Sequence, residues 1–231
     1  MSFTLYDYVL SGNCYKIRLF AALLGIDYDS VAVDFHPGRE HKSDEFLRRF
    51  PAGTLPILVA DNLVITETPA MLAWMAAKFD ASAKWMPWNE PTAVATTMQW
   101  LGFSSRLTST VGEARLHSML NRDIDVDKAM SGAVRALREL EAHLTEQSIR
   151  GHTWIAGDAP TIADIACFPY TALSPDAGIE HDTYPAIRNW LYAVRSLDQF
   201  ITMPGIHALH ELRGGETDHG QKTSAESRAD A

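Results

Sequence analysis

The most constraining feature of this chain is a change in the spacing of its apolar residues near residue 80. Before that point, segments with an apolar residue at every second position alternate with segments at the helical spacing of three and four residues. After residue 91 only the helical spacing continues. We therefore expect two packed units, an α/β unit followed by an all-helical unit.

The α/β unit, residues 1–80, is predicted to run in the order βαβα and then ββα. Strands are expected over 3–9, 28–35, 56–60 and 63–66, and helices over 15–24, 44–49 and 69–78. Ser43 is placed to cap the second helix, and Pro69 suits the first turn of the third. Asp61 and Asn62 form a good turn between the last two strands.

A proline-rich break at residues 81–91 is predicted to be a stiff linker, and residues 92–212 are predicted to be all-helical. Asn89 or Thr92 is expected to cap the first long helix. Apolar residues from 126 to 144 form a stripe at helical spacing, and further helices are expected over 185–196 and 206–212. Residues 213–231, rich in glycine, serine and charge, are predicted to be a disordered tail.

Thr161 and Asp164 have the spacing of a capping box, in which the later side chain reaches back to the N–H of the cap residue. The neighbouring residues are apolar, so we expect Asp164 to be buried and bonded to backbone N–H groups at the start of a helix over 162–170. This arrangement predicts a role in folding rather than in chemistry.

The composition is that of a globular protein, with 46% hydrophobic residues and a formal net charge of −9. The negative charge argues against a nucleic-acid partner. The longest strongly apolar run, residues 19–26, is too short to span a membrane, and the start of the chain does not have the pattern of a secretion signal. The two cysteines, Cys14 and Cys167, lie far apart, which favours a reducing cytoplasm and gives no indication of a metal site.

Ser11 follows the first predicted strand and precedes the first helix. Free backbone N–H groups and the positive end of the helix dipole favour an anion there, and the hydroxyl can donate a hydrogen bond to it. Lowering the pKa of a thiol by about two units requires roughly 2.7 kcal/mol, which one charged hydrogen bond and a helix terminus can supply together. The alternative is that Ser11 or Asn13 only caps the helix.

Three motifs give the chain a resemblance to glutathione transferases over about residues 1–205, closest to theta-like and many bacterial members. They are residues 11–18 (SGNCYKIR), residues 54–56 (TLP) and residues 67–68 (ET). The resemblance implies a thioredoxin-like domain with a mixed sheet that binds glutathione, followed by a helical domain that selects the second substrate. It places Ser11 on the serine that activates glutathione, with Asn13 in the same catalytic turn. The tyrosine of other classes would fall at Asp7.

The resemblance also implies the glutathione-binding residues. Pro56 matches a cis proline, which would let the backbone of Leu55, next to Thr54, pair with the cysteinyl part of glutathione. Glu67 and Thr68 match the pair that binds the γ-glutamyl group, and His41 and Lys42 match the region that meets the glycyl carboxylate. From the residues alone, a trans proline, an ordinary helix cap and a solvated charged turn remain alternatives.

The chain departs from the family pattern in two places. Delta-like members carry a histidine where Gly53 stands, and several classes carry an arginine at the position of Pro69. Cys14 follows Ser11 at the spacing of a C-x-x-C motif that has lost its first thiol, which disfavours two-thiol redox chemistry. We interpret Cys14 as a buried small side chain rather than a reactive thiol.

The second substrate is expected between Ser11 and the first long helix, near Trp100, Phe103, Arg106 and Leu107. Aromatic residues at helical spacing are also typical of a core, and that alternative stays open. The sequence thus favours an enzyme that ionises glutathione for attack on a small electrophile. The alternative function is a catalytically quiet module that binds ligands or proteins.

A homodimer is also expected, since family members are usually two-fold dimers. The third helix, with Met71, Trp74 and Met75, carries more apolar surface than one small domain readily covers.

Overall fold

The computed structural model describes residues 2–206, and its first part has the predicted order of strands and helices. The elements of this part are β1 (Thr4–Asp7), α1 (Gly12–Leu24), β2 (Asp29–Ala32), the short helix η1 (Glu40–Lys42), α2 (Asp44–Arg49), β3 (Ile57–Ala60), β4 (Leu63–Ile65) and α3 (Thr68–Phe79). Ser43 caps α2 as predicted, because its hydroxyl accepts the N–H of Phe46 at 3.2 Å.

The four strands form one mixed sheet in the order β2-β1-β3-β4. β1 and β2 are parallel, with Tyr6 opposite Val31, whereas β1 pairs with β3 in the antiparallel direction, with Tyr6 opposite Ile57. β3 and β4 form the predicted hairpin, in which Leu58 lies opposite Ile65. The carboxyl ends of β1, β2 and β4 therefore lie at the same edge of the sheet as the start of β3.

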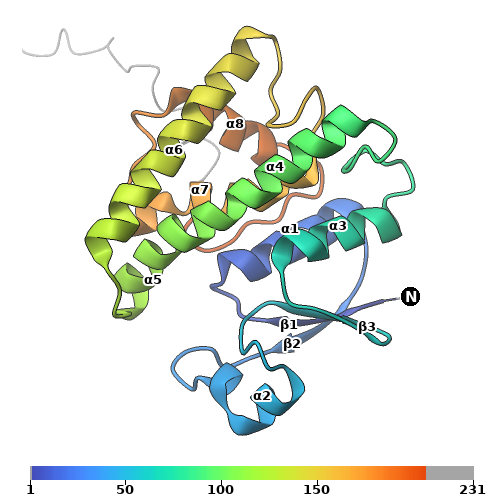
Figure 1. Ribbon diagram of the computed structural model, residues 1–231, viewed down its shortest axis with the longest axis vertical. Helices are drawn as coiled ribbons and strands as arrows, with labels where there is room; N and C mark the ends of the chain where they lie inside the picture. Colours follow the sequence, from blue (N-terminus) through green and yellow to red (C-terminus); the bar gives the residue numbers. More distant parts are fainter. Residues whose placement is uncertain (1, 207–231) are drawn as a thin grey trace, which may run out of the picture.

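Helices cover both faces of this sheet (Figure 1). α1 and α3 lie between the sheet and the helical part, and α2 lies on the opposite face. A small core of Tyr6, Val33, Phe46, Phe50 and Ile57 fills the space under α2. The other face belongs to a much larger core that continues without a break into the helical part.

The second part is helical, with one isolated β-bridge between Trp154 and Gly157 among the described residues. It contains α4 (Pro91–Leu107), the π-helical turn η2 (Thr108–Gly112), α5 (Glu113–Leu120), α6 (Val126–Ile149), α7 (Ile162–Ala172), the short helix η3 (Ser174–Ala177) and α8 (Pro185–Arg195). α7 is completely buried, and it packs against α4 and α1. α7 therefore joins the two parts of the molecule.

The cap of α4 differs from the expectation. Neither Asn89 nor Thr92 caps this helix, because Pro91 occupies its first position and Glu90 precedes it. The Glu90 carboxylate accepts the backbone N–H groups of Thr92 and Ala93. A carboxylate at this position also interacts favourably with the helix dipole, so Glu90 performs the capping role.

The segment between α3 and α4, predicted to be a stiff linker, is packed against the helical part of the molecule. Trp85 and Met86 are buried in the large core, and the carbonyl of Trp85 accepts the N–H of Ile162 at the start of α7. Buried side chains and a backbone hydrogen bond therefore hold this segment against the helical part.

The expectation that α3 leaves its apolar surface uncovered was wrong in part. Met71 and Met75 are completely buried, because α3 packs against both α1 and α7 of the same chain. Trp74 remains half-buried, and its ring meets those of Phe3 and Phe79 edge to face. These methionines thus give no argument for a partner.

Asp164 has the predicted position and the predicted contacts. It is 0% exposed, and it accepts hydrogen bonds from the N–H groups of Ile155 and Thr161, from the Thr161 hydroxyl and from the indole of Trp190. Burial raises the pKa of its carboxyl, and these hydrogen bonds act in the opposite direction. One carboxylate therefore joins the start of α7, the preceding loop and α8.

Some expectations lie outside the described residues: the helix over 206–212, apart from its first residue, and the polar tail 213–231. Among the residues that are described, none of the helices combines the length and the apolar character needed to cross a membrane.

We predict that Asp164→Ala lowers the free energy of unfolding by about 3 kcal/mol, because it leaves several buried donors without an acceptor. Urea denaturation followed by circular dichroism measures this change. The matched control is Asp158→Ala, which removes an exposed carboxylate beside the same segment and should change stability little. A variant at Asp164 that melts like the wild type would contradict the folding role.

Candidate functional site

The sheet register brings the sequence-predicted site residues to one edge. The segment with Ser11 follows β1, the segment with His41 and Lys42 follows β2, and Glu67 follows β4. Pro56 immediately precedes β3 at the same edge. Four segments that are distant in sequence therefore converge where loops leave the sheet, which is the common position of binding sites in such folds.

Ser11 lies at the centre of this edge as the N-cap of α1. Its hydroxyl oxygen accepts the N–H of Cys14 at 3.2 Å, and its own N–H donates to the carbonyl of Tyr8 at 2.9 Å. The capping alternative is thus confirmed as a structural fact. It does not exclude a chemical role, because an oxygen that accepts one hydrogen bond still has its own hydrogen to donate.

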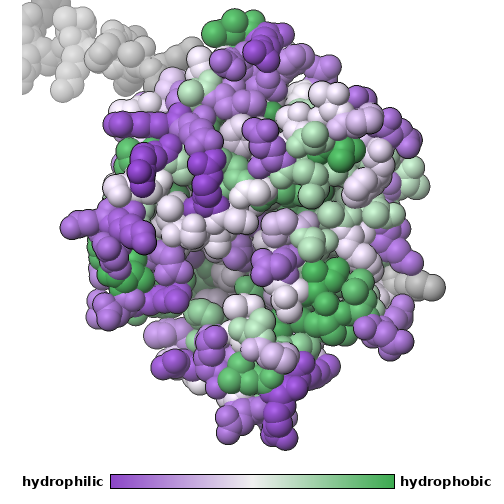
Figure 2. Space-filling model, viewed as in Figure 1, coloured by the Kyte–Doolittle hydropathy of each residue, from purple (hydrophilic) through white to green (hydrophobic). Residues whose placement is uncertain are grey.

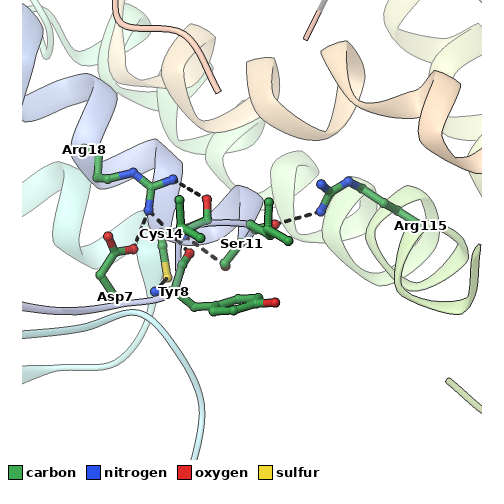
Figure 3. A network of polar contacts seen from close by, with 8 residues as sticks. Asp7, Tyr8, Ser11, Cys14, Arg18 and Arg115 are labelled. Carbon is green, nitrogen blue, oxygen red and sulfur yellow. Dashed lines mark hydrogen bonds and ion pairs between the residues drawn. The ribbon is translucent and has the colours of Figure 1, made fainter. Parts of the chain in front are cut away.

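The loop between β1 and Ser11 is held by two arginines from different parts of the chain (Figure 3). Arg18 pairs with Asp7 and donates to the carbonyls of Tyr8 and Val9. Arg115 extends from α5 and donates to the carbonyl of Leu10 at 2.8 Å. Every carbonyl of residues 8–10 therefore accepts from a guanidinium group, and the position of Ser11 is fixed from both sides.

Cys14 faces the interior directly behind Ser11. Its side chain is 0% exposed, and its sulfur accepts the N–H of Tyr8 at 3.4 Å. Burial raises the pKa of this thiol to about 12, with a smaller contribution from Asp7, and hydrogen bonds from Ser11 and Tyr8 offset only part of the change. The predicted burial of Cys14 is confirmed, and its lack of reactivity stays a prediction.

Asn13 points from the first turn of α1 toward the helical part. Its side-chain oxygen lies 3.3 Å from the hydroxyl of Thr108, which begins the π-helical turn. Its backbone N–H donates to the hydroxyl of Tyr170 on α7. The same Thr108 hydroxyl accepts from the buried ammonium of Lys16 at 3.3 Å. Asn13 therefore belongs to the contact between the two parts of the molecule.

A row of stacked rings connects the loop before Ser11 to His41. Tyr8 stacks on Phe35 with ring centroids 5.2 Å apart, and Phe35 stacks on His41 at 4.2 Å. His41 is buried, and its Nδ1 has no partner within the described structure. Burial lowers the pKa of His41, and the positive charges of Lys42, Arg39 and Arg122 lower it further. A cluster of positive groups thus surrounds an unsatisfied imidazole nitrogen.

The segment before β3 is tied to this cluster. The ammonium of Lys42 donates to the carbonyl of Gly53 at 2.7 Å, and the peptide bond between Leu55 and Pro56 is cis, as the motif predicts. Thr54 is exposed and Leu55 half-buried at the open edge. Gly53 has a φ of +54°, and a Cβ there would lie 2.6 Å from Leu47, so this backbone does not accommodate the histidine of delta-like members.

No side chain among the described residues caps the start of α3. Glu67 is its N-cap residue but makes no capping hydrogen bond with its side chain, which is exposed, whereas Thr68 is buried. Pro69 has no N–H to satisfy, so the N–H groups of Thr68 and Ala70 are the donors of this first turn. Together with the helix dipole, they favour an anion at this end of α3.

Both sequence-defined parts of the chain match known domain families. Residues 1–76 match the family described as "Glutathione S-transferase, N-terminal domain", and residues 123–192 match "Glutathione S-transferase, C-terminal domain". The chain belongs to the glutathione S-transferase family.

Individual relatives agree with this assignment. A solved structure described as a possible glutathione S-transferase from Rhodopseudomonas palustris is 30% identical, with a TM-score of 0.76, and the match covers 88% of this chain and 98% of that one. The disulfide-bond oxidoreductase YfcG of Escherichia coli is 27% identical over 80% of this chain and 86% of its own. The maleylacetoacetate isomerase of Pseudomonas aeruginosa is 24% identical, and the match covers 80% of this chain and 87% of that protein. Because these relatives have different activities, similarity alone does not determine the reaction.

The residues expected to line a second-substrate pocket do not form an exposed surface together. Trp100, Phe103 and Leu107 are at most 5% exposed and belong to the large core, where the Trp100 ring contacts those of Phe103 and His143. Arg106 points toward α6 and forms a two-pronged ion pair with Glu139. The core alternative therefore describes Trp100, Phe103 and Leu107 better, since they lie on the inner side of α4, whereas Arg106 is exposed.

Sequence reasoning missed Arg115, Arg122 and Tyr170 at this edge. Arg115 lies more than one hundred residues from Leu10, and neither its spacing nor its neighbours indicate a contact with that loop. Phe35 was assigned only to a strand. Such contacts are long-range, so only the folded chain identifies them.

We predict that Cys14 and Cys167 of the native protein resist a thiol-specific reagent at pH 8, because burial raises the pKa of both thiols and denies access. Both should react after denaturation in urea, which controls for prior oxidation. Rapid labelling of one native cysteine would contradict the assignment of Cys14 as a structural residue.

Proposed function

We propose that this protein is an enzyme that binds glutathione along the edge of the sheet, ionises its thiol at Ser11 and directs the thiolate at a small, hydrophobic or aromatic electrophile. The supporting observation is the position of Ser11. A hydroxyl at the end of a helix, in a loop fixed on both sides by arginines, faces the edge where the other predicted binding segments converge.

Ser11 stabilises the thiolate as a hydrogen-bond donor. The oxygen already accepts the Cys14 N–H, and without a ligand the hydroxyl also lies within hydrogen-bonding reach of the neutral Cys14 sulfur. A thiolate is a charged and therefore stronger acceptor than a neutral thiol. On binding, the hydroxyl turns to the glutathione sulfur, and the carboxylate-free first turn of α1 adds its dipole. Asn13, in the same turn, keeps α1 in register with the helical domain.

The γ-glutamyl end of glutathione is proposed to bind at the start of α3. Its carboxylate accepts from the Thr68 hydroxyl and from the N–H groups of the first turn, which no side chain caps, while the exposed Glu67 carboxylate accepts from its ammonium. The cysteinyl part pairs with the backbone of Leu55, which the cis bond to Pro56 leaves facing the site, beside Thr54.

The glycyl carboxylate is proposed to bind His41 and Lys42. The unpartnered Nδ1 of His41 can donate a hydrogen bond to it, and the surrounding positive groups of Arg39, Lys42 and Arg122 favour a negative charge.

The second substrate is proposed to bind between Ser11 and the helical domain. Val9 is 60% exposed beside Ser11, and Tyr8 and Phe35 are half-buried, so apolar surface is available for a hydrophobic electrophile. Trp100, Phe103 and Leu107 support this region from the core. The reaction class remains open among conjugation, dehalogenation, ether cleavage, isomerisation and C–S bond formation. A thiol oxidoreductase that uses Cys14 is disfavoured by the burial of that sulfur.

We predict that Ser11→Ala lowers kcat at least tenfold, roughly the effect of removing one donor to a developing charge, while the affinity for glutathione changes little. Calorimetry gives the affinity, and a general electrophile assay gives kcat. Ser11→Asp is a matched variant: it also caps a helix but repels a thiolate, so it should fold normally and lose more activity. Equal loss in Cys14→Ala with none in Ser11→Ala would overturn this role.

We also propose a homodimer. Leu63 and the half-buried Trp74 lie together on the face of the sheet that α3 covers, and a green patch at the lower right of Figure 2 lies where Figure 1 places the β3–β4 hairpin. Light scattering at micromolar concentration should give twice the mass of the 25.6 kDa chain. Leu63→Glu should reduce the mass to that of one chain, and a wild-type mass of one chain would contradict the dimer.

A further inference from the structure

Arg115 is an almost completely buried arginine outside the predicted glutathione contacts. Its side chain is 3% exposed and lies on α5, in the helical domain. Nε donates to the carboxylate of Asp176 at 2.7 Å, and Nη1 donates to the carbonyl of Leu10 at 2.8 Å. Burying a guanidinium requires strong partners, and both partners here are well placed.

The Leu10 carbonyl belongs to the residue immediately before Ser11. Arg115 therefore holds the peptide group that leads directly into the N-cap of α1, as Figure 3 shows. Arg18 holds the two preceding carbonyls, but it lies on α1 itself and moves with that helix. Arg115 is thus the member of the pair that fixes the loop relative to the helical domain.

Contacts on the other side of Ser11 come from the same domain. The ring of Tyr170 lies against Gly12 and Gly112, where an added Cβ would approach it to 2.9 and 3.0 Å respectively. The Tyr170 hydroxyl accepts the N–H of Asn13. The helical domain therefore contacts the residue before Ser11 and the two residues after it.

We propose that Arg115 is a positioning residue: it holds Ser11 in the orientation in which the hydroxyl donates to the thiolate. Arg115 does this from the helical domain, which receives the second substrate. This inference rests on the proposed function of Ser11. Arg115 makes no contact with glutathione in this proposal. Loss of the Arg115 side chain should therefore affect ionisation of the glutathione thiol and turnover rather than the binding of glutathione.

The test compares Arg115→Met, which keeps the length of the side chain but removes both hydrogen bonds, with Arg115→Lys, which keeps the charge and one donor. Thiolate absorbance of bound glutathione as a function of pH reports ionisation, and kcat and KM are measured separately. We expect Arg115→Met to raise the pH at which the thiolate forms and to lower kcat about tenfold, because a misplaced donor loses much of its effect. KM for glutathione should change less than about twofold.

Arg115→Lys should recover part of the wild-type kcat and part of the wild-type pH dependence of thiolate formation. Arg150→Met is the control, since it removes another arginine–carboxylate pair of the helical domain, at the end of α6. If Arg115→Met does not fold, Tyr170→Phe provides the second variant: it keeps the ring but removes the acceptor for Asn13, and it should shift ionisation in the same direction.

Two results are distinguishable. A wild-type protein that shows no thiolate at saturating glutathione overturns the proposed function and the role of Arg115 with it. A wild-type thiolate whose titration and kcat are unchanged in folded Arg115→Met and in Tyr170→Phe overturns the positioning role alone, because Ser11 would then be held without the helical domain.

Discussion

The structure depends on α1 being enclosed by both domains at once. Four consecutive residues of this helix, Cys14 to Ile17, are buried, so neither side of it faces water at this point. One side packs in the sheet domain and the other against α7. Even Lys16 is buried there, with Thr108 and the ring of Tyr170 as partners, and burial lowers its pKa to about 8. A buried lysine is tolerated at this position because its ammonium group donates to the Thr108 hydroxyl and lies over the Tyr170 ring.

This enclosure determines what the N-terminus of α1 can do. A helix that packs on both sides cannot shift easily, so the hydroxyl of Ser11 has a fixed position. The thiol directly behind it is buried and neutral, and in the proposed function the thiolate comes from a ligand at the open edge. Under that proposal, Cys14 fills space, and Ser11, which stands in place of the first cysteine of a C-x-x-C motif, supplies a hydrogen-bond donor.

Features that depend on neighbouring residues were predictable from the sequence. The caps at Ser43 and Thr161 follow from side chains that bond backbone groups two or three residues away, and the burial of Asp164 follows from its spacing to Thr161 and its apolar neighbours. The cis bond at Pro56 came from the motif. The cap at Glu90 was missed because a glutamate is an uncommon cap and Pro91 shifts the start of the helix.

Features that depend on distant residues were not predictable. Apolar spacing on α4 is the same for a core residue and for a pocket residue, so the burial of Trp100 and Phe103 follows only from the position of α7. The burial of Met71 likewise follows only from the packing of α3 against α1 and α7.

The most direct measurement is a crystal structure of the wild-type protein with glutathione. The account predicts the sulfur within hydrogen-bond distance of the Ser11 hydroxyl, with the γ-glutamyl carboxylate at the start of α3. Saturating glutathione that leaves this edge empty, or a sulfur placed away from Ser11, would contradict it.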